Sequence, residues 1–477
     1  MTRYVIKAPI SGITSDSRLV EKNNLFVAYP GQFSDGRKYI ADAVKRGAVA
    51  VIWEEDGFTW DPSWDVKNIA IPNLKLQAGY IASQFYKKPS SALWTVGVTG
   101  TNGKTSVSHW IAQAFDILKR NTAVVGTLGN GFLDMLEPAL NTTPGPIELQ
   151  KMLATYIKAH AEVVVMEVSS HGLDQGRLNG VEFDVAVFTN ISRDHLDYHK
   201  TIEAYQEAKK KLFKWSSLKA SVINHDDAFG RKLVQELSAE NRHTLTYGIK
   251  SGEVRATKLA LYEDSFAMHV ISPYGNAEVK VNLIGEFNVY NVLAVLSTLL
   301  VSDVAFEDAI NAIAQLKPVA GRMQMLGGGD KPMIVVDFAH TPDALEKVLK
   351  TLKAQAKAKV LCVFGCGGDR DAGKRSKMGK IVSKYADAAV VTSDNPRSEN
   401  PEKIIEQITE GMTGQYVVEV DRAKAITIGV LAAKAGDIVL IAGKGHEEYQ
   451  EVAGVKHYFS DVMQVEMVLA GYEEVQI

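Results

Sequence analysis

A lysine between glycine and threonine, behind an apolar run, is the first feature that could do chemistry. Residues 93–98 predict a buried strand, and G-T-N-G-K-T follows at 100–105. Glycines let backbone N–H groups turn toward phosphates, the lysine reaches the β- and γ-phosphates, and the hydroxyl can bind Mg²⁺. The full G-x-x-x-x-G-K-[ST] spacing needs glycine at position 98, where the chain has Val98, so the loop is shortened. The alternative is an incidental glycine-rich turn, but the helical pattern behind the loop favours nucleotide binding. The predicted loop residues are Gly100, Thr101, Asn102, Gly103, Lys104, Thr105 and Ser106.

Two further side chains could complete a metal site beside this loop. Glu167 ends an apolar run, which places its carboxylate at the end of a predicted central strand, where α/β sheets hold ligands. It is a candidate Mg²⁺ ligand, and the alternative is a strand-end glutamate that caps a helix. His195 and His199 have the H-x₃-H spacing of zinc ligands, but no further ligand stands nearby, so we do not expect zinc.

Three consecutive lysines at 209–211 would ordinarily form a solvated helix face. Helical periodicity separates them, because Lys209 shares one stripe with Ile202, Tyr205 and Leu212, whereas Lys210 and Lys211 point elsewhere. Burial disfavours the ammonium form of a lysine, and a neutral amine can add CO₂. Composition alone favours the solvated face, and periodicity marks Lys209 as the exception.

The elements that must position these residues follow an α/β pattern. Strand patterns alternate with helical ones, which predicts largely parallel sheets covered by helices. Thr341 and Pro342 begin one of the helices, as N-cap and first helical residue. The predicted strands are 93–98, 163–168, 185–188, 333–336, 360–364, 388–391 and 438–441.

The chain divides into three predicted domains. Residues 1–88 contain short apolar runs between polar stretches, as in a small mixed α/β unit, and K-K-P-S-S at 87–91 reads as a linker. A second α/β cycle follows, and a third, doubly wound one begins near Lys317. We therefore predict domains at 1–88, 89–316 and 317–477. A chain of 477 residues has room for about two to four ordinary domains.

Composition argues against several classes of protein. Hydrophobic content is 46% and charged content 23%, as in globular proteins, and 56 acidic against 53 basic residues give no basic excess for nucleic acid. The N-terminus has no signal-peptide pattern, and the apolar run near 291–301 is shorter than the ~20 residues that cross a bilayer. Cys362 and Cys366 are expected to be buried, reduced thiols, which favours a cytoplasmic location.

Five motifs together resemble the Mur ligases, ATP-dependent amide-forming enzymes that build the peptide stem of bacterial peptidoglycan. The resemblance covers essentially the whole chain. It implies an N-terminal UDP-binding domain, a central P-loop-type ATPase domain and a C-terminal Rossmann-like domain. We expect a monomer with small-molecule substrates and with neither nucleic-acid nor membrane partners. The motifs are T-G-T-N-G-K-T (99–105), N-T-T-P (141–144), E-V-S-S-H-G (167–172), N-I-S-R-D-H-L-D (190–197) and D-F-A-H-T-P (337–342).

The resemblance also implies a mechanism. A substrate carboxylate attacks the γ-phosphate of ATP, the acyl phosphate is attacked by an amine, and no protein nucleophile is needed. Lys104 and Mg²⁺ offset phosphate charge, and Lys209 is carbamylated so that its carbamate helps to hold Mg²⁺. Asn291 and Arg322 match positions near the adenine and the phosphates. The implied metal ligands are Thr105, Glu167, His195 (to a second Mg²⁺) and carbamylated Lys209.

The family branch with the most similar motifs adds the third amino acid to UDP-MurNAc-L-Ala-D-Glu. Residues matching its UDP site are Ser15, Ser17, Gln32, Phe33 and Ser34, of which Ser15 replaces an often apolar residue. Residues matching its muramoyl-peptide site are Asn141, Thr142, Thr143, Ser169, Gln175 and Arg177.

The choice of amino acid is expected at D-N-P-R (394–397) and G-K-G-H-E (443–447), which follow two predicted strands. In this branch D-N-P-R accompanies addition of meso-diaminopimelate rather than lysine. Diaminopimelate carries a second carboxylate, which a guanidinium can bind through two parallel hydrogen bonds. Outside the D-N-P-R motif, Arg397 would be interpreted as an ordinary surface arginine. The implied diaminopimelate residues are Arg370, Asp394, Asn395, Pro396, Arg397, Gly443 and Glu447, the last for an ammonium group.

Three other functions fit parts of this pattern. Folylpolyglutamate synthase shares the ATP loop and the chemistry, but it lacks the N-terminal UDP-binding domain and D-N-P-R. A P-loop kinase or motor ATPase would explain neither the α/β domain predicted at 317–477 nor Lys209 on its helical stripe. A catalytically dead regulatory protein would have no reason to keep Lys104, Glu167 and Lys209 together. The sequence therefore favours the ligase.

Overall fold

The computed structural model describes residues 9–31 and 34–472. By its contacts the chain divides into two compact units. The first comprises Met1–Glu253 with Ala294–Ala309, and the second comprises Val254–Leu293 with Ile310–Ile477. None of the helices within residues 9–31 and 34–472 has the length and apolar character that crossing a bilayer requires.

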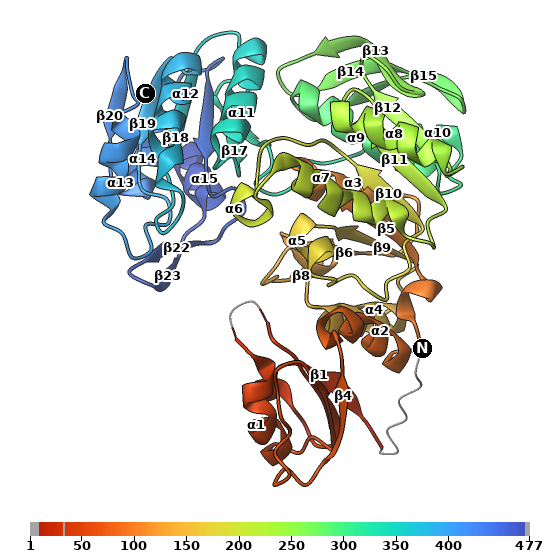
Figure 1. Cartoon of the computed structure of the whole chain (residues 1–477). Helices are drawn as coiled ribbons and strands as arrows, with labels where there is room; N and C mark the ends of the chain where they lie inside the picture. The colour runs from red at the N-terminus through yellow and green to blue at the C-terminus, as the bar shows by residue number, and fades with distance from the viewer. Residues whose placement is uncertain (1–8, 32–33, 473–477) are drawn as a thin grey trace. The chain divides into compact units, whose positions relative to one another are not determined.

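The first unit begins with a four-stranded parallel sheet, drawn in red in Figure 1. Its two inner strands, β2 and β3, overlap the apolar runs at residues 25–28 and 48–52. One face packs against α2 (Leu74–Phe85) and the other against α1 (Ile40–Lys45), so both faces are covered. The strands are β1 (Gly12–Thr14), β2 (Asn24–Ala28), β3 (Ala50–Glu54) and β4 (Lys67–Ile71).

The central sheet of the first unit has the parallel order β12-β11-β10-β5-β9-β6, with β7 and β8 added antiparallel at one edge. Because the parallel strands share one direction, their carboxyl ends form a common ligand-binding edge. The strands are β5 (Trp94–Thr99), β6 (Thr122–Gly126), β7 (Gly129–Phe132), β8 (Met135–Glu137), β9 (Val163–Glu167), β10 (Val185–Phe188), β11 (Ala220–Asn224) and β12 (Thr244–Gly248).

Helices bury this sheet. Side chains from α4 (Pro146–Lys158), α5 (Ser170–Asp174) and α8 (Ala228–Ala239) share one hydrophobic cluster with alternate strand residues. The helix after the phosphate loop, α3 (Lys104–Ile117), packs on β6 and β9. The expected linker is ordered, because Pro89–Ala92 forms a short 3₁₀ helix in which Pro89 and Ser90 are buried. The Ser90 hydroxyl accepts a hydrogen bond from Glu182 N, at 2.9 Å, which ties this segment to the central region.

The second unit contains an antiparallel meander of β13 (Val254–Leu261), β14 (Phe266–Ser272) and β15 (Gly275–Val281). Two further boundaries between the units fall inside α9 (Glu286–Leu300) and inside α10 (Phe306–Ala314). A six-stranded sheet of order β16-β17-β21-β18-β19-β20 is parallel except for β16. Its strands are β16 (Gln324–Gly327), β17 (Met333–Asp337), β18 (Val360–Phe364), β19 (Ala388–Val391), β20 (Tyr416–Val418) and β21 (Ile438–Ala442).

Helices cover both faces of this second sheet, as the doubly wound prediction required. One cluster gathers residues of α11 (Pro342–Gln355), α12 (Arg375–Tyr385) and α13 (Pro401–Thr409). The opposite cluster gathers α14 (Arg422–Leu431) and α15 (Asp461–Gly471). A hairpin of β22 (Tyr449–Val452) and β23 (Val455–Tyr458) lies between β21 and α15 in the chain.

The predicted α/β class is confirmed, and the seven predicted strands match observed ones to within one residue at each end. The Thr341 hydroxyl caps α11 as expected, accepting from Ala344 N at 3.3 Å. Cys362 and Cys366 are buried and free of disulfides, also as expected. The predicted domain boundaries stay predictions.

Candidate active site

The predicted phosphate loop, Gly100 to Ser106, runs from the end of β5 into the first turn of α3. Gly100 and Gly103 have φ of 153° and 86°, in the region that only glycine enters readily. A Cβ at Gly100 would collide with the Thr189 hydroxyl. The loop therefore needs these glycines, and it leads into a helix N-terminus, where free N–H groups attract anions.

The next strand along the sheet holds this loop in shape. Asn102 N donates to Asn190 Oδ1 and Asn190 Nδ2 donates back to Asn102 O, both at 3.1 Å. The Thr189 hydroxyl also donates to Asn102 O at 2.6 Å. Ser192 N donates to the Thr101 hydroxyl at 3.0 Å. The start of the 190–197 motif is therefore a support for the phosphate loop, a role that the sequence did not reveal.

Two lysines converge on one carbonyl of the loop. Lys104 Nζ lies 3.0 Å from Gly100 O, and Lys209 Nζ lies 2.8 Å from the same atom. Lys209 is only 1% exposed, and its ammonium lies 4.6 Å from the centre of the Tyr205 ring. Burial, reinforced by the positive charge of Lys104, holds the pKa of Lys209 well below its usual value. The predicted stripe lysine therefore has its ammonium form disfavoured, and it contacts the predicted phosphate loop.

Glu167, at the end of β9, lies beside the loop as predicted. It is 1% exposed, and its Oε2 accepts hydrogen bonds from the hydroxyls of Thr105, at 3.0 Å, and Thr127, at 3.1 Å. Thr127 N donates to its Oε1 at 2.8 Å. A carboxylate beside a hydroxyl fits Mg²⁺, which usually takes one or two carboxylates together with substrate phosphates. Among the described residues, no group of three or more His, Cys, Asp or Glu side chains is arranged to hold a metal by itself.

His195 lies in a cluster of aromatic side chains from α5, α6 (Leu196–His199) and α7 (Ile202–Lys210). Its ring centre is 4.9 Å from that of His171, which in turn lies 5.5 Å from His199. Burial lowers the pKa of all three histidines, and the charges of Lys104 and Lys209 lower the pKa of His195 further. A neutral imidazole can bind a metal. His171 was not among the predicted site residues, although it lies in a quoted motif, because nothing in its spacing separates it from a packing residue.

Four residues of the predicted muramoyl-peptide site form one hydrogen-bonded group. The Thr143 hydroxyl lies 2.9 Å from the Ser169 hydroxyl, and Arg177 Nη1 donates to Thr143 O at 3.0 Å. Arg177 Nε also donates to Gln175 Oε1 at 2.9 Å. The Thr142 hydroxyl lies 3.1 Å from the Thr127 hydroxyl, which in turn contacts Glu167. Asn141 is exposed.

Three of the predicted UDP residues, Ser15, Ser17 and Ser34, lie between strands of the N-terminal sheet. Ser15 and Arg177 both act on the pKa of the hydroxyl of Tyr29, a partly buried tyrosine that follows β2. Burial raises the pKa of Tyr29. Ser17 starts a 3₁₀ helix, and the Ser34 hydroxyl lies 3.1 Å from Tyr39 Oη. Gln32 and Phe33 lie outside the described residues.

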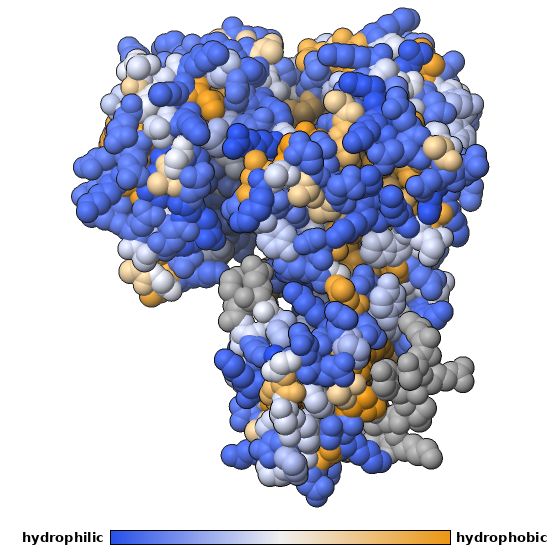
Figure 2. Space-filling model, in the orientation of Figure 1, coloured by the Kyte–Doolittle hydropathy of each residue, from blue (hydrophilic) through white to orange (hydrophobic). Residues whose placement is uncertain are grey.

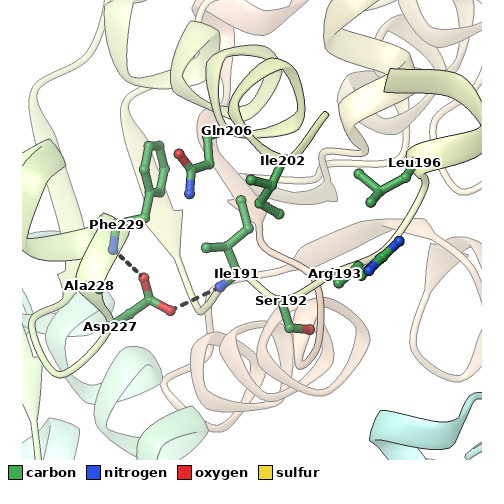
Figure 3. Close-up of a pocket in the computed structure, with 9 residues that line it drawn as sticks. All are labelled: Ile191, Ser192, Arg193, Leu196, Ile202, Gln206, Asp227, Ala228 and Phe229. Atoms are coloured by element: carbon green, nitrogen blue, oxygen red, sulfur yellow. Dashed lines mark hydrogen bonds between the residues drawn. The ribbon is translucent and has the colours of Figure 1, made fainter. Parts of the chain in front are cut away.

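A cavity of about 640 Å³ opens beside the loop support, between α7 and the start of α8 (Figure 3). Asp227 lies at its edge, where Oδ1 accepts from Phe229 N at 2.8 Å and Oδ2 accepts from Ile191 N at 3.0 Å. This carboxylate ties the first turn of α8 to the segment that supports the phosphate loop. The cavity contains none of the predicted binding residues. Its lining is Ile191, Ser192, Arg193, Leu196, Ile202, Gln206, Asp227, Ala228 and Phe229.

Asn291 and Arg322, predicted near the adenine and the phosphates, belong to the second unit. Asn291 is buried, and its Nδ2 donates to Asn288 Oδ1 at 2.9 Å. The Arg322 guanidinium lies 4.6 Å from the centre of the Phe338 ring, in the D-F-A-H-T-P motif. Both side chains are therefore held by neighbours rather than free in solvent.

D-N-P-R and G-K-G-H-E meet at the ends of β19 and β21. Asn395 Nδ2 donates to Glu447 Oε2 at 2.8 Å, and the fully buried Lys444 donates to Asn395 Oδ1 at 3.0 Å. Lys444 Nζ also lies 3.2 Å from Glu447 Oε2. A Cβ at Gly443 would lie 2.5 Å from Asp394 Oδ2, so the two turns are in close contact. Lys444, not predicted as a site residue, already offsets part of the negative charge of Glu447.

The two predicted arginines differ. Arg370 is exposed, and its Nη1 donates to the neighbouring Asp369 O at 3.1 Å. Arg397 is held by Gly368 O, 2.9 Å from its Nη1, and by Glu451, with 3.4 Å between Nε and Oε2. Glu451, on β22, is another neighbour that the sequence did not reveal.

Comparison with known families agrees with this arrangement. Three models match consecutive parts of the chain: the Mur ligase family catalytic domain at residues 9–86, the Mur ligase middle domain at 98–299 and the Mur ligase glutamate ligase domain at 321–445.

Curated relatives extend the match to nearly the whole chain. A UDP-N-acetylmuramoyl-L-alanyl-D-glutamate--2,6-diaminopimelate ligase of Chromobacterium violaceum is 51% identical over 468 residues, 97% of this chain and 95% of the relative. The Neisseria meningitidis serogroup B protein of the same name is 48% identical, over 94% of this chain and 92% of the relative. A solved structure bearing that name superposes with a TM-score of 0.73 at 38% identity, covering 98% of both chains. The chain therefore belongs to the Mur ligase family.

Proposed function

We propose that this chain is the ATP-dependent ligase that joins meso-diaminopimelate to UDP-MurNAc-L-Ala-D-Glu in peptidoglycan precursor synthesis. The observation that carries the proposal is the convergence of Lys104 and the buried Lys209 on Gly100 O. A kinase or motor ATPase has no use for a desolvated second lysine there. The names of the relatives support this choice of substrates.

The loop and the start of α3 would bind the triphosphate, with Lys104 on the γ-phosphate. Mg²⁺ held by Thr105 and Glu167 would neutralise further phosphate charge. Thr143, Ser169 and Arg177 would hold the peptide so that its terminal carboxylate attacks the γ-phosphorus in line. The amine of the incoming amino acid attacks the acyl phosphate, and the tetrahedral intermediate releases phosphate and leaves the amide.

Lys209 is proposed to act as a carbamate. Its neutral amine attacks the carbon of CO₂, an N–C bond forms, and one proton leaves, so that a potential cation becomes an anion. The buried surroundings that disfavour the ammonium supply the neutral amine for this step. The change of sign would replace repulsion from Lys104 by attraction, and the carbamate would offer Mg²⁺ an oxygen ligand in addition to those of Thr105 and Glu167. His195 would hold a second Mg²⁺ through its neutral ring.

Arg397 is proposed to select diaminopimelate through its second carboxylate, with Asp394, Asn395 and Glu447 on the ammonium groups. We further propose that the enzyme acts in the cytoplasm as a monomer. The two buried free thiols support the location, because extracellular proteins more often pair their cysteines.

An amino-acid competition assay tests the function. With ATP and UDP-MurNAc-L-Ala-D-Glu present, we expect meso-diaminopimelate to be incorporated in large excess over L-lysine at equal concentrations. Phosphate release should require both the UDP substrate and the amino acid. ATP hydrolysis at the same rate without them would identify a simple ATPase, and preferential incorporation of lysine would refute the assignment of the amino acid.

A further inference from the structure

The hairpin β22–β23 is fastened to the D-N-P-R turn. Gln450 Nε2 donates to Asp394 O at 2.7 Å, and Glu451 N donates to Asn395 Oδ1 at 2.9 Å. The first strand of the hairpin, β22, therefore lies beside Asp394 and Asn395, the two residues before Pro396. These bonds fix where the side chain of Glu451 can lie.

The backbone of Arg397 is also held by this hairpin. Its φ is 52°, a left-handed conformation that non-glycine residues rarely adopt. Arg397 N donates to Glu451 O at 3.0 Å, and Ala453 N donates to Arg397 O at 2.7 Å. Together they form a parallel bridge between Arg397 and Val452. The hairpin thus stabilises an unfavourable backbone at a residue proposed to bind substrate, a combination found at functional sites.

The guanidinium is held from two sides. Nη1 donates to Gly368 O at 2.9 Å, while Nε lies 3.4 Å from Glu451 Oε2. A Cβ at Gly367 would come within 3.0 Å of Nη1, so the glycine leaves room for the guanidinium. The side chains of Arg397 and Glu451 are 19% and 23% exposed. An arginine has five N–H donors, and within residues 9–31 and 34–472 no acceptor lies on Nη2, so its donors can bind a carboxylate.

We propose that Glu451 is a specificity-determining positioning residue, which fixes the Arg397 guanidinium so that its outer edge receives the second carboxylate of the amino acid. This inference rests on the proposed function. A guanidinium fixed before binding loses less side-chain entropy when the substrate arrives. Lysine, without that carboxylate, gains nothing from the arrangement, so Glu451 increases the discrimination between the two amino acids.

The test compares Glu451→Ala and Glu451→Gln with Glu448→Gln in the full-length enzyme. Glu448 is an exposed carboxylate three residues earlier, and its replacement makes the same change in net charge. We expect Glu451→Ala to raise the KM for diaminopimelate about tenfold, the effect of one charge-assisted contact. The KM for ATP and the Tm should stay near the parent values. Glu451→Gln should fall between, because its amide oxygen can still accept from Nε, and Glu448→Gln should match the parent. The preference for diaminopimelate over lysine should fall with the rise in KM.

Three outcomes would overturn the inference. An unchanged KM for diaminopimelate would show that Arg397 needs no such support. A lower KM would show that Glu451 competes with the substrate carboxylate instead of positioning its partner. An equal rise in the KM for ATP and for diaminopimelate, with a lower Tm, would indicate general damage. All three presuppose a parent enzyme that uses diaminopimelate, so a parent without that activity would instead refute the proposed function.

Discussion

At the scale of single residues, Lys209 is buried, lies beside the positive charge of Lys104 and is proposed to form a carbamate. We expect Lys209→Ala to abolish ligation, because the carbamate that would hold Mg²⁺ cannot form. A small carboxylic acid such as formate or acetate should restore part of the activity by supplying the missing oxygens. The measurement is phosphate release with all three substrates, with and without the acid.

Lys210 provides the matched control for this prediction. It is adjacent in sequence, but it pairs at the surface with Glu207 and Glu236, at 2.7 and 3.0 Å. Lys210→Ala should therefore retain activity. Full activity of Lys209→Ala without added acid would remove the carbamate from the mechanism.

Arg397 carries the second prediction at this scale. Arg397→Lys keeps the charge but loses the planar pair of donors. The KM for diaminopimelate should rise by about one to two orders of magnitude, as expected for losing one charged hydrogen bond of a bidentate pair. Steady-state titration of each substrate measures this, and the KM for ATP should change far less. Equal effects on both substrates would disprove the assignment of Arg397.

At the scale of elements, the first residues of α14 and α15 form a fully buried ion pair. Arg422 Nε and Nη2 donate to the two oxygens of Asp461, both at 2.7 Å, and neither side chain is exposed. Arg422 Nη2 also donates to Ala442 O at 3.1 Å, at the end of β21. This pair therefore anchors two helices to a strand that leads into the G-K-G-H-E turn.

We expect Arg422→Met alone to destabilise the protein by about 3–5 kcal/mol, because it leaves a buried carboxylate without a partner. The double variant Arg422→Met with Asp461→Leu should recover much of that loss, since an apolar pair of similar volume removes both charges. Denaturant unfolding of the two variants measures the difference. If the double variant is no more stable than the single one, the uncompensated charge is not the cause.

Helix α7 illustrates how much a sequence pattern can predict. The stripe separated Lys209 from its neighbours, and the structure buries Lys209, Tyr205 and Leu212 while Lys211 stays exposed. Ile202 on the stripe and Lys210 off it are both partly buried, so the separation is less sharp there. Periodicity succeeded there because burial repeats with the helical turn. The pairing of Glu451 with Arg397 could not be predicted, because it depends on the path of a hairpin and not on spacing in the chain.

At the scale of the whole chain, seven buried parallel strands were predictable because each contains a continuous apolar run. The parallel strands β6, β11 and β12 were not predicted, because polar residues leave them only short apolar runs. The strands from 254 to 281 were not predicted. In β13 and β15 buried residues alternate with partly or fully exposed ones, so neither strand forms an apolar run. The motifs located most of the candidate site, but its supports, Thr127, Asn190 and Lys444, come from contacts that only the fold creates.

The Gly100 carbonyl, which accepts from two lysines, has a further consequence for drug resistance. It is a main-chain atom, so no codon change can delete it, and any side chain at position 100 would collide with Thr189. An antibacterial compound that bonds to this carbonyl would rely on a contact that point mutations cannot remove directly. Resistance would have to arise from substitutions of the residues around the compound, and their proposed catalytic roles also limit which substitutions are tolerated.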